Sequence, residues 1–465
     1  MKILFIQPPI EDFYTTHIRT YPLGLLYIAS LLVQHGHEAR ILNALERKKG
    51  KEIPLPVELK YLNQHYTSYD PPFFRSFCHF GYSYGYIEKK IREYSPDIVG
   101  ISANFTPYFE EVISVARRVK NAGADIPVVI GGHHASVFGK EIIEDYDCID
   151  YVITGEGAYP FLHLADHLNG KRGGEDLYSV ISKNVPFKRS SAAQRIDGLE
   201  IQCNHSLLDH SRYTIGKKRY ISMLASRGCP YRCGFCSVQH IFGSAIRYRS
   251  PDSIIEEITT AVRSHDIEIV NFEDDNITYD RSIFVDIMQK IITGIRKDRE
   301  IELSAMNGIC ADKLDEETVC LMKKAGFHSL NISLVSIDSA IQKKYSRNTT
   351  VEHIEQAVRE GKKQGMFITV YLIIGLPGQT KKEVRDTIDH LLGLDVLVGP
   401  SVFYPVPGSY AYDVCLDKGY ITGKDWRTYR STAASVETDT LSRKDIFELF
   451  HYCRNKNLEK KQEKA

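Results

Sequence analysis

Three cysteines share one short loop of the chain. Cys229, Cys233 and Cys236 lie in the run Ser226-Arg-Gly-Cys-Pro-Tyr-Arg-Cys-Gly-Phe-Cys, directly after an apolar stretch that predicts a strand. Three thiolates on one loop can bind three irons of a 4Fe-4S cluster and leave the fourth iron open. An iron with an open position indicates chemistry on a bound substrate or cofactor.

A structural zinc site is the alternative interpretation of this loop. Such a site uses four ligands, usually as two spaced pairs, and no second Cys-x-x-Cys or His-x-x-x-His follows nearby. The seven other cysteines are scattered and predict mostly buried thiols, not a disulfide scaffold. Cys310 and Cys415 follow segments expected at the catalytic end of a barrel, so a radical-quenching role stays open for either.

The bulk composition excludes several classes of protein. The 465 residues suffice for about three domains, and 43% apolar with 25% charged residues is ordinary for a globular protein. Lys plus Arg equals Asp plus Glu at 59 each, which argues against a nucleic-acid partner and favours a small molecule. The longest apolar stretch, 23–33, is too short to span a bilayer. The first residues predict a strand and not a signal peptide, so a cytoplasmic location is expected.

The N-terminal region, 1–170, alternates between strand-like and helix-like patterns. This alternation predicts a parallel α/β sheet of the Rossmann-like, flavodoxin-like kind, in which a ligand lies over the carboxyl ends of the strands. An aromatic-rich insertion, 45–86, interrupts the pattern and either covers a ligand or packs between domains. The expected strands are 3–7, 37–43, 97–102, 126–130 and 149–153, and the expected helices are 23–35, 86–94 and 108–122.

A second α/β region follows a polar linker, 171–219. Between 220 and 415, six strand-like runs alternate with helical stretches, which predicts a partial (β/α)6 barrel of TIM-like type. The cysteine loop follows the first barrel strand, where barrel enzymes place their active sites. Residues 416–465 are expected to form a helical extension with a charged tail. The six strands are predicted at 220–226, 268–273, 301–306, 328–335, 367–375 and 395–403.

The cysteine spacing, with Phe235 just before the last cysteine, resembles the signature of the radical S-adenosylmethionine (SAM) superfamily. This resemblance implies that SAM binds the open iron and that the ends of the barrel strands form the rest of its pocket. The implied SAM-binding residues are Phe235, Glu273, Asp274, Asn307, Ser336 and Gly375. In the run Phe272-Glu-Asp-Asp-Asn276, we expect Glu273 or Asp274 to face inward, and Asn276 or Thr278 to lie nearer a helix cap. Val335 replaces the glutamate that relatives commonly carry, which puts the usual ribose contact in doubt.

The N-terminal loops resemble those of the cobalamin-binding Rossmann-like fold. A serine after the third strand and a Gly-Gly pair after the fourth line the slot for the nucleotide tail in that family, and adjacent glycines let the backbone approach a bulky ligand. The implied cobalamin-binding residues are Ser102, Thr106, Gly131, Gly132, His133, Gly155 and Glu156. A module that binds another ligand is the alternative.

The histidine motif that supplies the lower axial ligand of cobalt in part of this family is absent. The corresponding loop reads Pro8-Pro-Ile-Glu-Asp-Phe-Tyr. His17, His133 and His134 are candidates for that position, although loop packing explains them as well.

With this domain order the chain resembles the cobalamin-dependent radical SAM enzymes. The resemblance implies a 4Fe-4S cluster, SAM and cobalamin as cofactors, an electron donor such as flavodoxin or ferredoxin, and methylation of an unactivated carbon of a small molecule. A radical oxidoreductase or cyclase without net methylation is the runner-up. A tRNA methylthiotransferase would need a second cysteine triad, and a noncatalytic corrinoid carrier would need no cluster loop.

Overall fold

The computed structural model divides the chain into two compact units, which we describe separately. Unit 1 comprises Met1–Pro56, Phe74–Tyr213 and His240–Gly243, and unit 2 comprises Val57–Phe73, Thr214–Gln239 and Ser244–Ala465. The structure describes residues 1–14, 21–47, 49–66, 69, 76–174, 177–183, 187–188 and 199–463. His17, Phe73, Phe74 and parts of the predicted linker lie outside these ranges.

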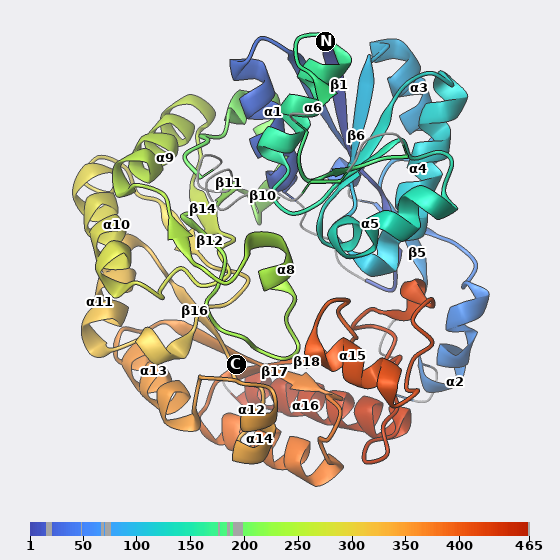
Figure 1. Ribbon diagram of the computed structural model, residues 1–465. Helices are drawn as coiled ribbons and strands as arrows, with labels where there is room; N and C mark the ends of the chain where they lie inside the picture. Colours follow the sequence, from blue (N-terminus) through green and yellow to red (C-terminus); the bar gives the residue numbers. More distant parts are fainter. Residues whose placement is uncertain are drawn as a thin grey trace. The chain divides into compact units, whose positions relative to one another are not determined.

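Unit 1 is built on a six-stranded sheet with the order β3-β1-β6-β7-β8-β9 (Figure 1). The first five strands are parallel, and only β9 runs antiparallel, to β8. This is the flavodoxin-like strand order, whose ligand site lies where the order reverses at the carboxyl ends of the strands. The strands are β1 (Lys2–Gln7), β3 (Glu38–Asn43), β6 (Ile98–Ser102), β7 (Val128–Gly131), β8 (Tyr151–Ile153) and β9 (Val180–Ile181).

The helices of unit 1 bury apolar side chains. They are α1 (Leu23–Gln34), α3 (Tyr84–Tyr94), α4 (Phe109–Ala122), α5 (His133–Asp145) and α6 (Ala158–Leu168). Within α4, for example, Val112, Val115 and Val119 are fully or almost fully buried. Spacings of three and four residues place these side chains on one face, which explains why the segment forms a sheet-covering helix.

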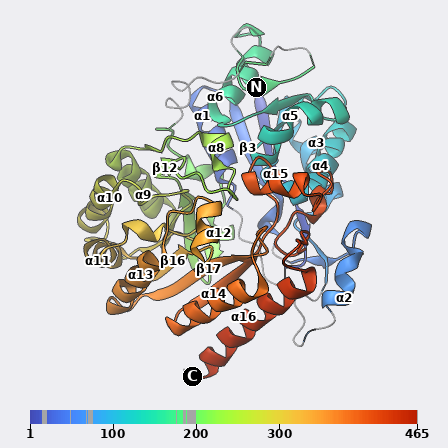
Figure 2. The ribbon, with the colours of Figure 1, turned by 60° about the horizontal axis from the view of Figure 1, so that its bottom comes forward.

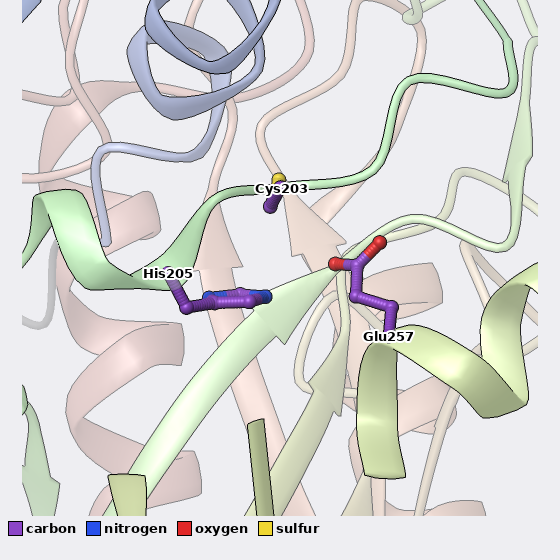
Figure 3. Close-up of side chains that lie close together, drawn as sticks. All are labelled: Cys203, His205 and Glu257. Atoms are coloured by element: carbon purple, nitrogen blue, oxygen red, sulfur yellow. The ribbon is translucent and has the colours of Figure 1, made fainter. Parts of the chain in front are cut away.

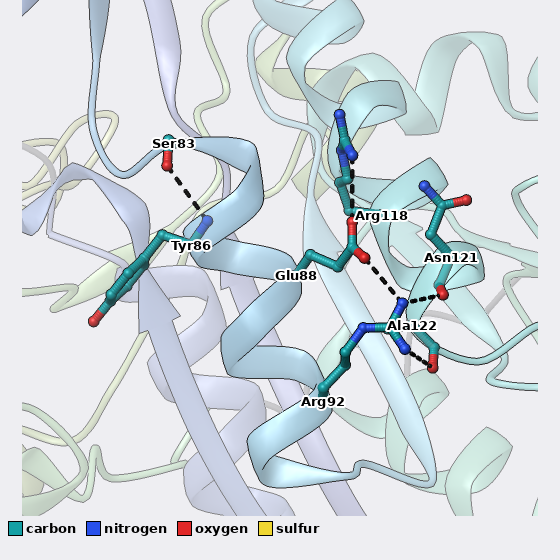
Figure 4. Close-up of polar contacts among 7 residues, drawn as sticks. All are labelled: Ser83, Tyr86, Glu88, Arg92, Arg118, Asn121 and Ala122. Atoms are coloured by element: carbon teal, nitrogen blue, oxygen red, sulfur yellow. Dashed lines mark hydrogen bonds and ion pairs between the residues drawn. The ribbon is translucent and has the colours of Figure 1, made fainter.

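Charged side chains join α3 to α4 on their solvent side (Figure 4). The carboxylate of Glu88 accepts hydrogen bonds from Arg92 at 2.9 Å and Arg118 at 3.3 Å. Arg92 also donates to the carbonyls of Asn121 and Ala122, at the end of α4. A cation there complements both the unpaired carbonyls and the negative end of the helix dipole. These exposed contacts orient the helices but contribute little stability individually.

Unit 2 contains six parallel strands in the order of the sequence. They are β11 (Lys218–Met223), β14 (Ile269–Phe272), β15 (Glu302–Ser304), β16 (Ser329–Ser333), β17 (Phe367–Ile374) and β18 (Leu397–Val402). β11-β14-β15 and β16-β17-β18 form two sheets, and parallel bridges from Leu303 to Phe327 and from Ile309 to Ile332 join them. The result is an open six-stranded arc.

Helices cover the outer side of this arc (Figure 1). They are α9 (Pro251–His265), α10 (Arg281–Gly294), α11 (Glu316–Ala325), α13 (Val351–Lys363), α14 (Lys381–Gly393) and α16 (Arg443–Glu463). Figure 2 shows α14 and α16 side by side; α16 also packs on β18. Capping side chains begin most of these helices, as where Ser250 accepts from the Ser253 amide at 3.2 Å before Pro251.

The predicted fold class is confirmed: a flavodoxin-like sheet precedes a partial six-stranded barrel. Each predicted strand and helix given above corresponds to an observed element, with ends that differ by at most three residues. The small antiparallel sheet β2-β5-β4 (Ile10–Asp12, Cys78–Phe80 and Lys51–Glu52) was not predicted. Its strands have two or three residues, too few to show a period-two pattern. No described helix is both long and apolar enough to cross a bilayer.

Part of the aromatic insertion belongs to unit 2. The 3₁₀ helix η2 (Val57–Leu62) and α2 (Asn63–Tyr66) lie in this part. The Tyr61 hydroxyl donates to the carbonyl of Ala433 at 2.9 Å, and the Arg443 guanidinium lies 4.3 Å from the centre of the Tyr61 ring. This part of the insertion therefore packs against the C-terminal segment of unit 2.

Gly132 generates a prediction about the stability of unit 1. Its φ is +125°, and a Cβ atom there would lie 2.3 Å from Asn104 Oδ1 and 2.8 Å from the Ala103 carbonyl carbon. We expect Gly132→Ala to reduce the free energy of unfolding of unit 1 by about 2–4 kcal/mol, because backbone strain and overlap add. Denaturant unfolding measures this change.

Gly24→Ala is the matched control. Gly24 lies in α1, and its added Cβ would meet nothing within 4 Å. A stability gain of about 0.5–1 kcal/mol is expected there, since alanine is the better helix former. Equal effects of the two substitutions would contradict the close approach at Gly132.

Candidate cluster and cofactor sites

The cysteine loop is held through the peptide groups of Gly234. The Gly234 amide donates to the carbonyl of Tyr345 at 2.9 Å, and the Gly234 carbonyl accepts from the amide of Ala411 at 2.7 Å. Tyr345 follows α12 (Ser339–Lys344), and Ala411 lies in α15 (Tyr410–Asp417). Segments that follow the fourth and sixth strands of the arc therefore position a loop that follows the first.

Cys233 is buried, Cys229 is partly buried, and Cys236 is the exposed member of the three. Desolvation within the loop raises the pKa of the Cys229 thiol, and charge repulsion from Cys233 acts in the same direction. Two side chains donate to this group: Asn276 Nδ2 lies 3.8 Å from Cys229 Sγ, and an Arg347 nitrogen lies 3.8 Å from Cys233 Sγ. Sequence reasoning missed Arg347 and assigned Asn276 to capping, whereas Asp280 caps α10.

Asp274 has a structural role at the base of the cysteine loop. Its carboxylate accepts from the Ala225 amide at 3.1 Å and from both the amide and the hydroxyl of Ser226 at 2.5 Å. Burial raises its pKa to about 7. Asp275 accepts from the Gly228 amide, and burial raises its pKa to about 6. These contacts hold the start of the loop, so Asp274 serves the loop backbone.

Glu273 ends a polar row that crosses three strands of the arc. Ser222, Asn271 and Ser304 are neighbours in the register of β11, β14 and β15. Asn271 donates to Ser222 at 3.3 Å and accepts from Ser304 at 2.8 Å. One oxygen of Glu273 accepts from Ser222 and Asn271. The Glu273 side chain is partly exposed, and these two donors orient its carboxylate.

The other predicted SAM-binding residues occupy different surroundings. Asn307 is exposed and donates to the Glu273 carbonyl at 3.2 Å. Phe235 is partly buried, with its ring 6.3 Å from that of Tyr345. Gly375, with φ +105°, donates its amide to Gln379 Oε1 at 2.9 Å. Ser336 is fully buried and donates to Glu383, an arrangement typical of a structural role.

Arg249 is not available for a ligand. It forms a buried ion pair with Glu257 of α9 at 2.8 Å, with both side chains about 1% exposed, and it donates to the Leu224 carbonyl at 3.2 Å. The guanidinium of Arg249 is therefore engaged by protein groups at the start of α9. Figure 3 labels Glu257 together with Cys203 and His205, which belong to unit 1.

The predicted cobalamin-binding residues lie along the carboxyl edge of the unit 1 sheet. Ser102 and Gly131 are paired in the register of β6 and β7. The Ala103 amide donates to the Gly131 carbonyl at 2.7 Å, and the His134 amide donates to the Ala103 carbonyl at 3.1 Å. These bonds extend the strand pairing into the two loops, which explains why only glycine fits at 132.

A serine outside the predicted set joins the next pair of loops. Ser136 Oγ donates to the Gly132 carbonyl at 2.7 Å and accepts from the Gly155 amide at 2.9 Å. Gly155 has φ +71°, and Glu156 beside it is partly exposed. The ring of His133 is partly exposed and lies 6.5 Å from that of Phe242, which also belongs to unit 1. The edge therefore combines small residues with few side chains that would obstruct a ligand.

His134 and Thr106 form an internal contact of this edge. His134 Nδ1 lies 3.2 Å from Thr106 Oγ1, and its ring lies 4.2 Å from that of Phe109. Burial lowers the pKa of His134 to about 3, so the ring is neutral. His134 thus packs within its loop, as one of the two interpretations predicts, and is not placed as an axial ligand.

The two cysteines considered as radical quenchers differ in position. Cys415 lies in an apolar cluster with Tyr345, Leu376 and Phe403. Cys310 is buried beside charged groups: burial raises the pKa of its thiol to about 12, and Arg347, Asp312 and the cluster cysteines also influence it electrostatically. Cys310 is therefore placed near the thiols of the cysteine loop, whereas Cys415 lies in the apolar cluster against which Phe235 of that loop packs.

Comparison with protein-family models matches each unit to a different family. Residues 223–391 match the Radical SAM superfamily, and residues 81–165 match the B12 binding domain. The chain is a cobalamin-dependent radical SAM protein. The match covers the cysteine loop in one unit and the Gly131-Gly132 edge in the other, so the residues that carry the resemblance lie inside the matched ranges.

Curated relatives with both methyltransferase and cyclase names resemble the chain. It is 26% identical to an uncharacterized methyltransferase of Pyrococcus horikoshii, over 92% of this chain and 86% of the relative. It is 25% identical to cytidylyl-2-hydroxyethylphosphonate methyltransferase of Streptomyces wedmorensis, over 93% and 84%. It is 26% identical to the anaerobic magnesium-protoporphyrin IX monomethyl ester cyclase of Rubrivivax gelatinosus, over 78% and 66%.

Among solved structures, a similar fold is that of the radical SAM methyltransferase TsrM from Kitasatospora setae with cobalamin and a [4Fe-4S] cluster bound. The TM-score is 0.66 at 17% identity, over 90% of this chain and 75% of that chain. At this identity the likeness concerns the fold.

The geometry of unit 2 fits a cluster with an open iron. Three thiols converge on one loop, and two N–H donors point at their sulfurs. Asn276 Oδ1 is buried and has no hydrogen-bond partner among the described residues. A buried acceptor of this kind requires a donor, which an amino group bound beside the cluster would supply.

His134 generates a prediction about pH. Its folded-state pKa, about 3, lies below the ordinary value of 6.5. The resulting stability is complete above pH 6.5 and is lost as pH falls, by about 2 kcal/mol at pH 5, because the unfolded chain binds a proton that the folded one does not. Chemical unfolding between pH 7.5 and 5 measures the slope.

We expect His134→Gln to flatten this acid-side slope and the same change at exposed His35 to leave it unaltered. Equal slopes in the wild-type and His134→Gln chains would contradict the assignment of a neutral, buried ring.

Gly234 generates a prediction about cluster loading. A Cβ there would lie 3.1 Å from Tyr410 and 3.2 Å from Tyr345, so the branched side chain of Gly234→Val must displace the loop. We expect iron per chain after anaerobic reconstitution to fall by more than half, with little change in the unfolding temperature. Gly393→Val, where nothing lies within 4 Å, is the control; normal iron in Gly234→Val would show that the loop tolerates displacement.

Proposed function

We propose that this protein uses a 4Fe-4S cluster, SAM and cobalamin to methylate an unactivated carbon of a small molecule. The observation that supports the proposal is that one chain contains both features. A three-thiol loop follows the first strand of the arc in the Radical SAM match, and a glycine-rich sheet edge lies in the B12 binding domain match. When bound, the cluster and SAM supply a radical that removes a hydrogen atom, and cobalamin supplies the methyl group.

The roles of the residues follow from their contacts. Cys229, Cys233 and Cys236 bind the cluster. Asn276 Oδ1 accepts from the amino group of SAM, because it is a buried acceptor beside Cys229. Glu273, partly exposed at the end of β14, is a second acceptor in the same pocket. The exposed amide of Asn307 and the Gly375 turn lie at the ends of β15 and β17, where the strand ends of a barrel place ligand contacts.

In unit 1, the edge formed by Ser102, Gly131, Gly132 and Gly155 holds cobalamin. Its glycines permit the close backbone approach that a bulky nucleotide tail needs. Thr106 contributes through its contact with His134, and His133 and Glu156 are the partly exposed polar groups at this edge.

The proposal includes an external electron donor, such as a flavodoxin or ferredoxin, because the cluster must be reduced before it acts. A cytoplasmic location accompanies it, since cluster thiols need a reducing compartment. The substrate is a small molecule.

A cyclisation or oxidation without net methylation is a second candidate. The observation that favours it is the 26% identity to the cyclase of Rubrivivax gelatinosus. Both candidates share SAM cleavage and differ in the fate of the methyl group of SAM.

The test is anaerobic reconstitution followed by incubation with dithionite and methyl-labelled SAM. We expect about four irons and one cobalt per chain, formation of 5′-deoxyadenosine, and transfer of label to the bound cobalamin. In the Cys229/Cys233/Cys236→Ala variant, iron and 5′-deoxyadenosine should fall to background, because no ligands remain for the cluster.

The matched control replaces three cysteines outside the loop: Cys78, Cys148 and Cys320 by Ala. It should cleave SAM at the wild-type rate. Release of 5′-deoxyadenosine without label on cobalamin would support the second candidate, and undiminished function of the loop variant would identify a corrinoid carrier.

A further inference from the structure

Arg347 places a positive charge beside one thiol of the cysteine loop. A nitrogen of its guanidinium lies 3.8 Å from Cys233 Sγ in donor geometry. The other terminal nitrogen donates to the carbonyl of Ser333 at 3.0 Å and to its hydroxyl at 2.7 Å. The planar guanidinium is thus fixed at the end of β16, with one terminal nitrogen directed at the sulfur.

The backbone around Arg347 explains how this position is maintained. The chain reverses after α12 through Ser346, whose φ is +50°, and the Arg347 amide donates to the Gln342 carbonyl at 2.9 Å. The residue before this turn, Tyr345, accepts the hydrogen bond from Gly234. One turn therefore holds the cysteine loop through its backbone and approaches Cys233 through a side chain.

Arg347 differs from the other donor to this loop. Asn276 donates to Cys229 with a neutral amide, whereas the guanidinium carries a full charge at every accessible pH. Among the described residues, Arg347 is the charged side chain with a hydrogen bond to a cysteine of the loop. Hydrogen bonds to the sulfurs and nearby charge are the main means by which a protein adjusts the reduction potential of an iron-sulfur cluster.

We propose that Arg347 is a positioning residue that raises the reduction potential of the cluster bound by Cys229, Cys233 and Cys236. The inference rests on the proposed function, because it requires that cluster. Reduction adds one electron, from the external donor, and hence one negative charge to the site. A guanidinium hydrogen-bonded to a ligand sulfur stabilises this extra charge and so favours the reduced state.

The experiment is a redox titration of the reconstituted full-length protein without SAM, followed by electron paramagnetic resonance. In Arg347→Gln, which keeps N–H donors but loses the charge, we expect the ratio of reduced to oxidised cluster at the wild-type midpoint to fall about tenfold. This change corresponds to a shift of about 59 mV for a one-electron couple. Arg347→Lys, which keeps the charge without the fork, should give a smaller shift in the same direction.

Arg281→Gln is the matched control. Arg281 is a partly exposed arginine of α10 that pairs with Asp315 and Glu317, so its loss removes one charge from unit 2 without touching the cysteine loop. Its midpoint should equal that of the wild type. If Arg347→Gln assembles too little cluster to titrate, the midpoint of Arg347→Lys is compared with that of the wild type instead. An unchanged midpoint in Arg347→Lys would then overturn the inference.

A wild-type midpoint in Arg347→Gln, with normal iron content, would overturn the inference. That result together with lost SAM cleavage would assign the arginine to SAM alone. A wild-type protein that binds no cluster would instead overturn the proposed function, so the two failures are distinguishable.

Discussion

The Gly234 peptide is the constraint on which the site in unit 2 depends. Three thiols can share one cluster only if their loop keeps a single conformation, and a loop of eight residues has no core of its own. The amide and the carbonyl of Gly234 are hydrogen-bonded to Tyr345 and Ala411, which follow different strands of the arc. The loop can therefore form only when the arc from β11 to β18 is complete, which couples cofactor binding to the folding of the whole unit.

The acidic run after β14 shows how neighbouring residues of the same type take different roles. Asp274 and Asp275 are turned toward the backbone of the loop that begins at Ala225, and burial raises the pKa of both. Glu273 lies on the polar row of Ser222 and Asn271 and remains partly exposed. Adjacent carboxylates are thus divided between support of the loop and the polar row of the strands.

Two short segments belong to a different unit from the residues on either side of them in the sequence. Val57–Phe73 lies between parts of unit 1 but belongs to unit 2, and His240–Gly243 lies between parts of unit 2 but belongs to unit 1. A single cut at Tyr213 would remove a piece from each. The composition of these two segments does not reveal which unit each belongs to, because aromatic and small residues pack equally well in either unit.

The sequence by itself determined the architecture and the position of the three-cysteine loop. Alternation of apolar runs sets the βα units, since each strand and helix must bury one face locally, and the spacing of Cys229, Cys233 and Cys236 places three thiols within one loop. Tertiary structure alone decided the roles that depend on approach between distant segments. Arg347 donates to Cys233, which lies more than a hundred residues earlier in the chain. Arg249 forms a buried ion pair with Glu257, and Ser336 donates to Glu383. Such pairings leave no local pattern, because they depend on where the strands of the arc bring their ends together.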